Sequence, residues 1–210
     1  MTLKLYYWPR SSATRVQWAL EELGVPYEKA RLDRERNDNR TPEYLAISPQ
    51  GNIPALVDGD AKIFESAAVL IHLGQRYGVE KGLWPKSPAG AADALVWCVW
   101  SSSELGVQRL AYALQTLDAP FALPKEDRNP KVAERFRAAY YARIAVLEGR
   151  LAGKDYLVGN AFSLADVALA QPVASATARL GLPVTDHKNV TAWVERCTSR
   201  PAFQRVMAET

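Results

Sequence analysis

Apolar positions along the first part of the chain alternate between strand-like and helix-like spacing. Residues Leu3 to Tyr7 are short, apolar and β-prone, and after Pro9 to Ser12 the spacing becomes helical until Gly24. A second strand is predicted over Pro26 to Leu32, because a proline at the start of a strand removes little hydrogen bonding. Since a helix connects the two strands, we expect them to be parallel neighbours in one sheet.

The following residues extend this unit with a hairpin and another helix. A short helical turn is expected at Tyr44 to Ile47. The strand-like runs Ile53 to Val57 and Ala61 to Phe64 flank an Asp-Gly pair, which is typical of an antiparallel hairpin. Glu65 and Ser66 then open a helix that ends at Gly78. The predicted order of this first domain, residues 1–78, is βαβαββα.

Beyond this unit the strand signals disappear. Residues 79–90 are rich in Gly, Pro, Lys and Ser, which is typical of a linker. Helical spacing then covers Ala91 to Leu117, Pro130 to Leu151, Leu164 to Leu180 and Val190 to Cys197, with a last short turn after Pro201. The chain is therefore predicted to have an α/β domain followed by an all-α domain over residues 91–210.

Composition excludes several classes of protein. The chain has 210 residues, 48% of them hydrophobic, so it can bury a core without a disulfide or metal. A net charge of +3 without long runs of like charge predicts neither nucleic-acid nor membrane binding. The two cysteines form no CxxC pair, and no secretory or membrane-spanning segment is visible, so we expect a cytoplasmic protein. The two histidines, His72 and His187, are too far apart for a local metal motif.

Candidate chemistry lies at the starts of three helices. Ser11 and Ser12 open the first helix, where unpaired N–H groups favour an anion such as a thiolate, but where serine is also an ordinary cap. Glu65 and Ser66 have the same two interpretations. The S-x-x-D run that ends at Asp166 predicts a structural capping box, whose loss costs about 1 kcal/mol.

Together these segments resemble the cytosolic glutathione transferases over essentially the whole chain. The resemblance is to serine-type, phi/theta-like bacterial members, and it implies a thioredoxin-like domain, a helical domain, a homodimer and glutathione as co-substrate without a metal. The motifs that carry it are P-x-S-x-x-T-R-V at Pro9 to Val16, L-E-E-L-G-V-P-Y-E at Leu20 to Glu28, S-P-Q-G-N-I-P-A-L at Ser48 to Leu56, F-E-S at Phe64 to Ser66 and S-L-A-D at Ser163 to Asp166.

The same resemblance implies a set of glutathione contacts. Glu65 and Ser66 would bind the γ-glutamyl group, and Ile53, before a cis-proline at Pro54, would pair its backbone with the cysteinyl part. Arg40 would meet the glycyl carboxylate. The remaining expected contacts are Asn52, at a place usually held by Gln or a similar residue, and Ser103 and Glu104, in a segment similar to the dimer side of bacterial members.

The bacterial cysteine-using class does not match fully. Its neighbouring Asn and His positions are Val99 and Gly106 here, and no cysteine occupies the activating position. The resemblance assigns the activating hydroxyl to Ser11, with Ser12 and Tyr7 as alternatives. Lowering a thiol pKa from about 8.5 by about two units requires roughly 2.7 kcal/mol. A hydrogen bond to the thiolate contributes about 1.5–3 kcal/mol and a helix N-terminus about 0.3–1 kcal/mol, so one hydroxyl donor at that helix start is about sufficient.

The expected reaction is conjugation of the glutathione thiolate to a small hydrophobic electrophile, a detoxification chemistry. The residues expected to line the electrophile pocket are Trp8, Arg10, Trp100, Gln108 and Tyr112. Two alternatives stay open: a glutathione-dependent isomerase or dehalogenase with the same fold, and a non-catalytic binding module.

Overall fold

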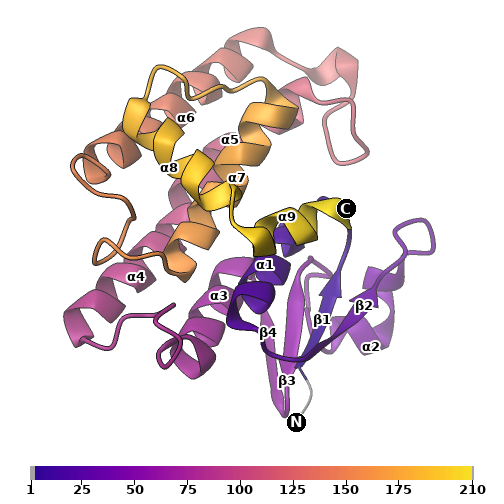
Figure 1. Ribbon diagram of the computed structural model, residues 1–210. Helices are drawn as coiled ribbons and strands as arrows, with labels where there is room; N and C mark the ends of the chain where they lie inside the picture. The colour runs from indigo at the N-terminus through magenta and orange to yellow at the C-terminus, as the bar shows by residue number, and fades with distance from the viewer. Residues whose placement is uncertain (1–2, 210) are drawn as a thin grey trace.

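A four-stranded mixed sheet forms the centre of the first unit in the computed structural model, which describes residues 3–209 (Figure 1). The strands lie in the order β2-β1-β3-β4, with β1 parallel to β2 and the other neighbours antiparallel. The strand bounds are β1 Leu3–Tyr7, β2 Tyr27–Arg31, β3 Ala55–Asp58 and β4 Ala61–Phe64. The predicted crossover and hairpin are both present.

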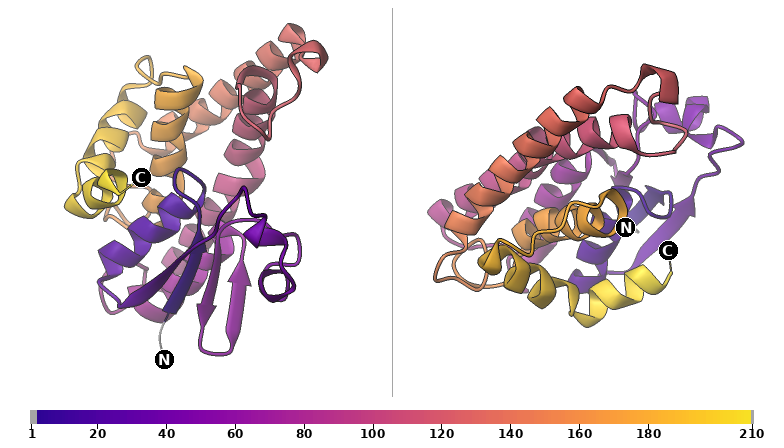
Figure 2. Two further views of the ribbon diagram at one scale, coloured as in Figure 1. Left: turned by 90° about the vertical axis from the view of Figure 1, so that its right-hand side faces the viewer. Right: turned by 90° about the horizontal axis from the view of Figure 1, so that it is seen from above.

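Helices cover both faces of this sheet. Figure 2 shows α1 (Ala13–Leu23) and α3 (Ser66–Leu73) on one face, with the short α2 (Pro42–Leu45) beside the other. A 3-10 turn, η1 (Asp38–Arg40), precedes α2. The predicted βαβαββα order is therefore confirmed. The strand β3 begins at Ala55, two residues later than expected, since Pro54 has no N–H to donate to a ladder.

The second unit is helical, as predicted. Its helices are α4 Pro88–Trp100, α5 Val107–Thr116, α6 Pro130–Arg150, α7 Leu164–Leu180, α8 Lys188–Thr198 and α9 Pro201–Ala208, with the 3-10 turn η4 Lys125–Asp127 before α6. The last helix, α9, returns to the first unit and packs against α1 (Figure 1), where Phe203 and Trp18 have ring centroids 4.8 Å apart.

Two π-helical turns interrupt the expected helices. The helix from Ser66 ends at Leu73 and continues as a π turn, η2 (Gly74–Gly78), and the run expected from Ala91 to Leu117 is divided by η3 (Ser101–Gly106). The helix α4 begins inside the expected linker, because Ser87 Oγ accepts from the Gly90 N–H and Pro88 fits the first helical position. The division into residues 1–78, 79–90 and 91–210 stays a prediction, and residues 1, 2 and 210 lie outside the described residues.

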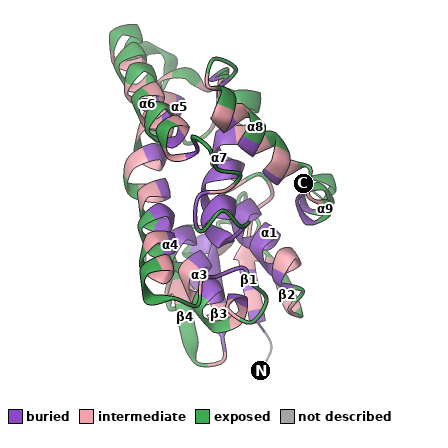
Figure 3. Ribbon diagram, turned by 60° about the vertical axis from the view of Figure 1, so that its left-hand side comes forward, coloured by how far each residue is buried: buried purple, intermediate pink, exposed green. Residues whose placement is uncertain are grey.

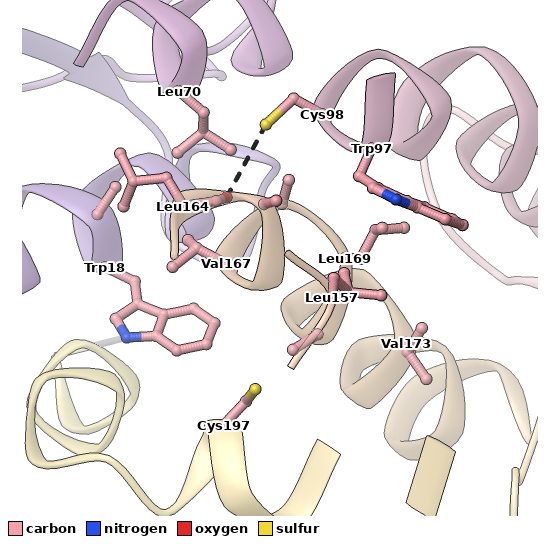
Figure 4. Close-up of a cluster of buried hydrophobic side chains, with 14 of the residues drawn as sticks. Trp18, Leu70, Trp97, Cys98, Leu157, Leu164, Val167, Leu169, Val173 and Cys197 are labelled. Atoms are coloured by element: carbon pink, nitrogen blue, oxygen red, sulfur yellow. Dashed lines mark hydrogen bonds between the residues drawn. The ribbon is translucent and has the colours of Figure 1, made fainter. Parts of the chain in front are cut away.

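One hydrophobic core joins the two units. Figure 3 shows that buried residues concentrate on α1 and α7 in the middle of the molecule. In Figure 4, Trp18 and Leu70 of the first unit lie around Leu164, whose carbonyl oxygen accepts a weak hydrogen bond from Cys98 Sγ at 4.0 Å. Burial raises the pKa of the Cys98 thiol to about 12. Burial also raises the pKa of the Cys197 thiol. Both cysteines are therefore packing residues. Within residues 3–209, no helix has the length and apolar character needed to cross a membrane.

Candidate functional site

Two connected cavities lie where the sheet unit meets the helical unit. The larger is a cleft of about 1430 Å³ bounded by the loops after β1 and β2, the loop before β3 and the start of α3. The second has about 400 Å³ and extends between α5 and α7. Residues common to both walls include Ser11, Ser12, Glu65 and Ser66. The predicted hydroxyl and γ-glutamyl positions therefore lie at the junction of the two cavities.

The loop between β1 and α1 places both serines at a helix start. Ser11 Oγ donates to the Trp8 carbonyl oxygen at 2.7 Å and accepts from the Ala13 N–H at 3.1 Å. Ser12 Oγ donates to the Ile53 carbonyl oxygen at 2.8 Å. Tyr7, at the end of β1, packs against the core and lines neither cavity. A ligand in the cavities can thus reach the serines but not the tyrosine.

Two hydroxyl groups form hydrogen bonds with the backbone of the loop before β3. The Asn52 carbonyl oxygen accepts from Tyr44 Oη at 2.6 Å and from Ser48 Oγ at 3.1 Å. The Ile53–Pro54 peptide is cis, as the resemblance implied. Asn52, Ile53 and Pro54 all line the large cleft, so this expected set of contacts is assembled on one wall.

Arg40 also forms a hydrogen bond with the backbone of this loop. Its Nη1 donates to the Gln50 carbonyl oxygen at 2.9 Å, and Asn39 Nδ2 donates to the Gly51 carbonyl oxygen at 2.8 Å. Gly51 has a φ of +65°, and a Cβ there would lie 2.6 Å from the Asn39 carbonyl oxygen. Only glycine therefore allows this close approach, which fixes Arg40 beside the cleft.

At the start of α3 the backbone of Glu65 has an unusual conformation, and the next residue contacts a buried arginine of α1. Glu65 has a φ of +65° without being glycine, a conformation that is rare and clusters at binding sites. Its exposed side chain faces the cavities, while the next residue, Ser66, is buried. Ser66 Oγ accepts a 2.5 Å hydrogen bond from Arg15 Nη2. The orientation of Ser66 is thus set from α1.

Arg15 is a cation in the core between the units. Its Nη1 also donates to Ser101 Oγ at 3.2 Å and to the Ala168 carbonyl oxygen at 3.0 Å, so it joins α1, α3, η3 and α7. Burial, together with the nearby charge of Arg109, lowers the pKa of Arg15 to about 10. At neutral pH Arg15 is still charged, and it adds positive potential beside Ser11 and Ser66.

The second cavity differs from the expected electrophile pocket. Trp8 and Arg10 do line the large cleft, and Arg10 also lines the second cavity. Trp100 instead packs against Trp97, with ring centroids 5.4 Å apart, and neither Gln108 nor Tyr112 lines either cavity. The residues of α5 that do so are Val107, Arg109, Leu110, Ala113 and Leu114.

The π turn η3 explains this difference. In an uninterrupted α-helix, Gln108 would lie within about 80° of Trp100 about the helix axis. One residue more in a turn rotates the rest of the helix by about 100°. The face of α5 that meets the cavities carries Val107, Leu110 and Leu114, with Arg109 and Ala113 beside them, and Gln108 and Tyr112 lie outside it.

Ser103 and Glu104 lie on the far side of this turn from the cavities. Ser103 is exposed and its Oγ donates to the Val99 carbonyl oxygen at 3.1 Å, whereas Glu104 Oε2 accepts from Arg143 Nη2 at 3.0 Å. Neither residue lines the cavities of the single chain. Their predicted part in glutathione binding stays a prediction for an assembled dimer.

Sequence reasoning missed Arg15, which is buried, and Arg109, which is half-buried. Arg15 lies four residues before Ala19 and Arg109 lies four before Ala113, so each shares a helix face with a buried alanine. The signal in the sequence was an arginine at a position that shares the apolar face of its helix, which indicates a cation at the boundary between the units. Among residues 3–209, no three His, Cys, Asp or Glu side chains are grouped so that they could hold a metal ion.

Family models match both units of the chain. The N-terminal glutathione S-transferase domain matches residues 1–75, and the C-terminal glutathione S-transferase domain matches residues 109–201. Glutathione S-transferase F10 of Arabidopsis thaliana is 32% identical over 218 residues, covering 100% of this chain and 98% of that protein. The glutathione S-transferase GstB of Escherichia coli K12 is 31% identical over 205 residues, covering 95% of this chain and 96% of that protein.

Solved structures agree with this assignment of the fold. A glutathione transferase from Burkholderia graminis, with two glutathione molecules bound per subunit, has a TM-score of 0.86 and 28% identity, and covers 98% of this chain and 87% of that one. The transferase URE2P5 of Phanerochaete chrysosporium has a TM-score of 0.89 at 24% identity, with 99% and 94% covered, and this likeness concerns the fold alone.

Proposed function

This chain belongs to the glutathione S-transferase family, and we propose that it conjugates the glutathione thiolate to small electrophiles bound in the second cavity, with Ser11 stabilising the thiolate. The observation that carries this proposal is the position of Ser11 and Ser66 in the walls of both cavities. A thiol held at that junction has glutathione-binding groups on one side and space for a second substrate on the other.

The walls of the large cleft suit the charges of glutathione. The Glu65 carboxylate can pair with the γ-glutamyl ammonium, and the Ser66 N–H and hydroxyl at the start of α3 can bind the adjacent carboxylate. Arg40 also lines this cleft and supplies a cation for the glycyl carboxylate. Ile53 lines the same cleft, and its backbone serves the cysteinyl part. Glutathione is the only co-substrate that this proposal requires.

Ser11 can donate to a thiolate at the cost of one internal hydrogen bond. Its hydroxyl proton now points to the Trp8 carbonyl oxygen, while its oxygen accepts from Ala13. A rotation of the hydroxyl exchanges a neutral hydrogen bond for one to a charged group, which is stronger by roughly 1 kcal/mol. The N-terminus of α1 and the charge of Arg15 supply the rest of the stabilisation of the thiolate. Ser12 is the second candidate, but its rotation would release the Ile53 carbonyl oxygen that it now contacts.

The reaction follows from this arrangement. The thiol proton leaves to solvent, and the sulfur stays as a thiolate held by the hydroxyl, the N-terminus of α1 and the positive potential of Arg15. The sulfur then attacks an electrophilic carbon in the second cavity, a C–S bond forms, and the leaving group departs with its electron pair. Ser11 donates a hydrogen bond throughout and forms no covalent bond.

Product analysis with three single variants tests this function. We expect mass spectrometry to show an S-substituted glutathione after incubation with a benzylic halide, and turnover to fall by about tenfold or more in Ser11→Ala. Ser12→Ala and Tyr7→Phe should retain more activity than Ser11→Ala. Unchanged total glutathione after turnover would indicate an isomerase, and release of halide without a stable conjugate would indicate a dehalogenase. Failure to bind a glutathione column would favour the non-catalytic module.

The proposal includes a homodimer in the cytoplasm, with detoxification as its role. Three large apolar side chains of α4, Leu95, Val96 and Val99, are 41%, 55% and 44% exposed in the single chain. An apolar helix face of this kind supports burial against a second copy. Light scattering of the purified chain tests the dimer, since a monomeric mass would contradict it.

A further inference from the structure

The second cavity carries more positive than negative side chains. Among residues 3–209, its walls contain four arginines and one carboxylate, that of Glu65. The arginines are Arg10, Arg15, Arg109 and Arg179. Because the proposed function assigns Glu65 to the ammonium of glutathione, the second substrate meets a wall that is cationic. An uncharged electrophile would make no use of this charge.

Arg109 differs from the buried arginine beside it. Arg15 donates three hydrogen bonds, to Ser66, Ser101 and Ala168. Within the described part of the chain, Arg109 takes part in no hydrogen bond or ion pair, and its buried Nε has no acceptor. Burial lowers the pKa of Arg109, Tyr140 opposes this effect, and Arg179 lowers the pKa further. Arg109 is half-buried, and a cation in such a place without an acceptor is unfavourable unless a ligand supplies one.

The charges of glutathione do not require Arg109. Arg31, Arg34 and Arg40 line the large cleft and not the second cavity, while Arg109 lines the second cavity and not the large cleft. The two carboxylates of glutathione already have proposed partners in Arg40 and Ser66. Arg109 is therefore available to a different anion.

The rest of the second cavity is suited to an apolar body. Its walls include Leu110, Leu117, Phe121 and Leu180. Leu110 is 49% exposed and Phe121 is 42% exposed in the single chain, so both present uncovered apolar surface to a ligand. Since Ser11 lies in the same wall, one ligand can present its reactive carbon to the thiolate and its far end to Arg109.

We propose that Arg109 binds an anionic group of the second substrate, so that the preferred electrophiles combine an apolar body with a carboxylate. This assignment rests on the proposed transferase function, which it makes more specific. Arg179, whose Nη1 donates to the Arg10 carbonyl oxygen at 3.0 Å, lies at the same cavity and adds to its positive potential. Glutathione itself lacks the apolar body that these walls would cover.

A matched pair of substrates tests the assignment. The anion para-(bromomethyl)benzoate and its neutral methyl ester share the ring, the reactive carbon and the leaving group. In both, the thiolate sulfur forms the C–S bond, the C–Br bond breaks and bromide leaves with the electron pair. We expect kcat/KM, divided by the uncatalysed rate constant, to favour the carboxylate in the native chain. Arg109→Met should reduce this preference by about tenfold or more, equivalent to about 1.4 kcal/mol.

Three controls keep the test specific. Arg109→Lys should restore part of the preference, because it keeps the charge. Arg135→Met, which removes an exposed arginine of α6, should leave the preference unchanged. Arg109→Met should also melt no lower than the native chain, since it removes a half-buried cation whose Nε lacks an acceptor. A preference that is the same in native and Arg109→Met proteins would overturn the assignment.

A binding measurement separates this inference from the proposed function. Calorimetry with para-ethylbenzoate, in the presence of unreactive S-methylglutathione, should give a Kd about tenfold or more higher for Arg109→Met than for the native chain. If this difference appears but neither bromide is converted, the transferase function fails and the anion site stands. If the ester is converted well but the benzoate does not distinguish the two proteins, the function stands and the anion site fails. Inhibition by excess glutathione that Arg109→Met abolishes would assign the site to a second glutathione and overturn the proposal.

Discussion

Arg15 Nη2 donates a 2.5 Å hydrogen bond to Ser66 Oγ, and this contact connects the core between the units to the proposed glutathione site. The donor lies in α1 and the acceptor in the first turn of α3. The same guanidinium also holds Ser101 and the Ala168 carbonyl oxygen. Arg15 is therefore a positioning residue, which acts on the ligand through Ser66.

We expect Arg15→Met to weaken glutathione binding by about tenfold, because Ser66 loses its donor and the cleft loses positive potential. Arg15→Lys should restore part of the affinity. Fluorescence titration of Arg15→Met, Ser66→Ala and the double variant checks the mechanism, since the two losses should not add. Additive losses would show that Arg15 acts on glutathione binding independently of Ser66.

A second prediction concerns Gly51, whose φ is +65°. A Cβ there would lie 2.6 Å from the Asn39 carbonyl oxygen and 2.9 Å from Arg40 Nη1, so Gly51→Ala must displace the loop that holds Arg40. We expect a rise in the KM for glutathione and a loss of stability above the roughly 1–2 kcal/mol of a left-handed alanine. Gly82→Ala is the matched control, since Gly82 has a φ of +69° and open space around it. An equal rise in KM in both variants would refute the role of this loop.

Asp166 has more partners than a capping box requires. Besides the Ser163 N–H and hydroxyl, its carboxylate accepts from the Leu157 N–H at 3.0 Å and from Trp193 Nε1 at 2.9 Å. The cost of about 1 kcal/mol expected from the sequence therefore applies to Ser163→Ala and is too small for Asp166. Asp166→Ala should lower the free energy of unfolding by about 3–5 kcal/mol, because it leaves several buried donors unpaired. Urea unfolding checks both values, and equal costs would contradict this reasoning.

The stability of the hairpin should depend on acid pH through Asp58. Burial raises the pKa of Asp58, but hydrogen bonds from His72 and Tyr77 and the charge of Arg76 together lower it below the ordinary value of 3.8. The ionised carboxylate therefore adds stability above that value, and this contribution is lost as pH falls through the lower folded-state pKa.

Comparison with Asp58→Asn checks this dependence. The native chain should be the more stable protein at neutral pH, and the difference in unfolding free energy should shrink at pH values below 3.8. Asp60→Asn, in the same turn but exposed, should change the stability by less than about 0.5 kcal/mol. A difference for Asp58→Asn that is constant across pH would contradict the role of its charge.

The sequence predicts the bounds of a helix best where both of its ends carry residues that are typical of helix caps. The bounds of α7 agree with prediction because Ser163 precedes the helix and Gly181, with a φ of +63°, ends it. The π turn η3 has no such signal, because its residues also fit an α-helix. The phase of α5 after it could therefore not be predicted.

The candidate site also has a part that the sequence predicts and a part that it does not predict. Ser11, Ile53 and Glu65 lie in short loops and at helix starts, where a linear motif fixes their place relative to the sheet, and all three line the large cleft. The second cavity depends instead on which face of α5 is turned toward α7. This is a matter of packing between distant segments, and it explains why Gln108 and Tyr112 were expected at a wall that other residues of α5 form.

The most direct test of the central claim is the pKa of the glutathione thiol bound to the native chain and to Ser11→Ala. It is measured by ultraviolet thiolate absorbance during a pH titration. We predict a bound thiol pKa about two units below the free value of about 8.5 in the native chain, and a return toward that value in the variant. A bound thiol with the same pKa in both proteins, or with no shift in the native chain, would contradict the assignment of thiolate stabilisation to Ser11.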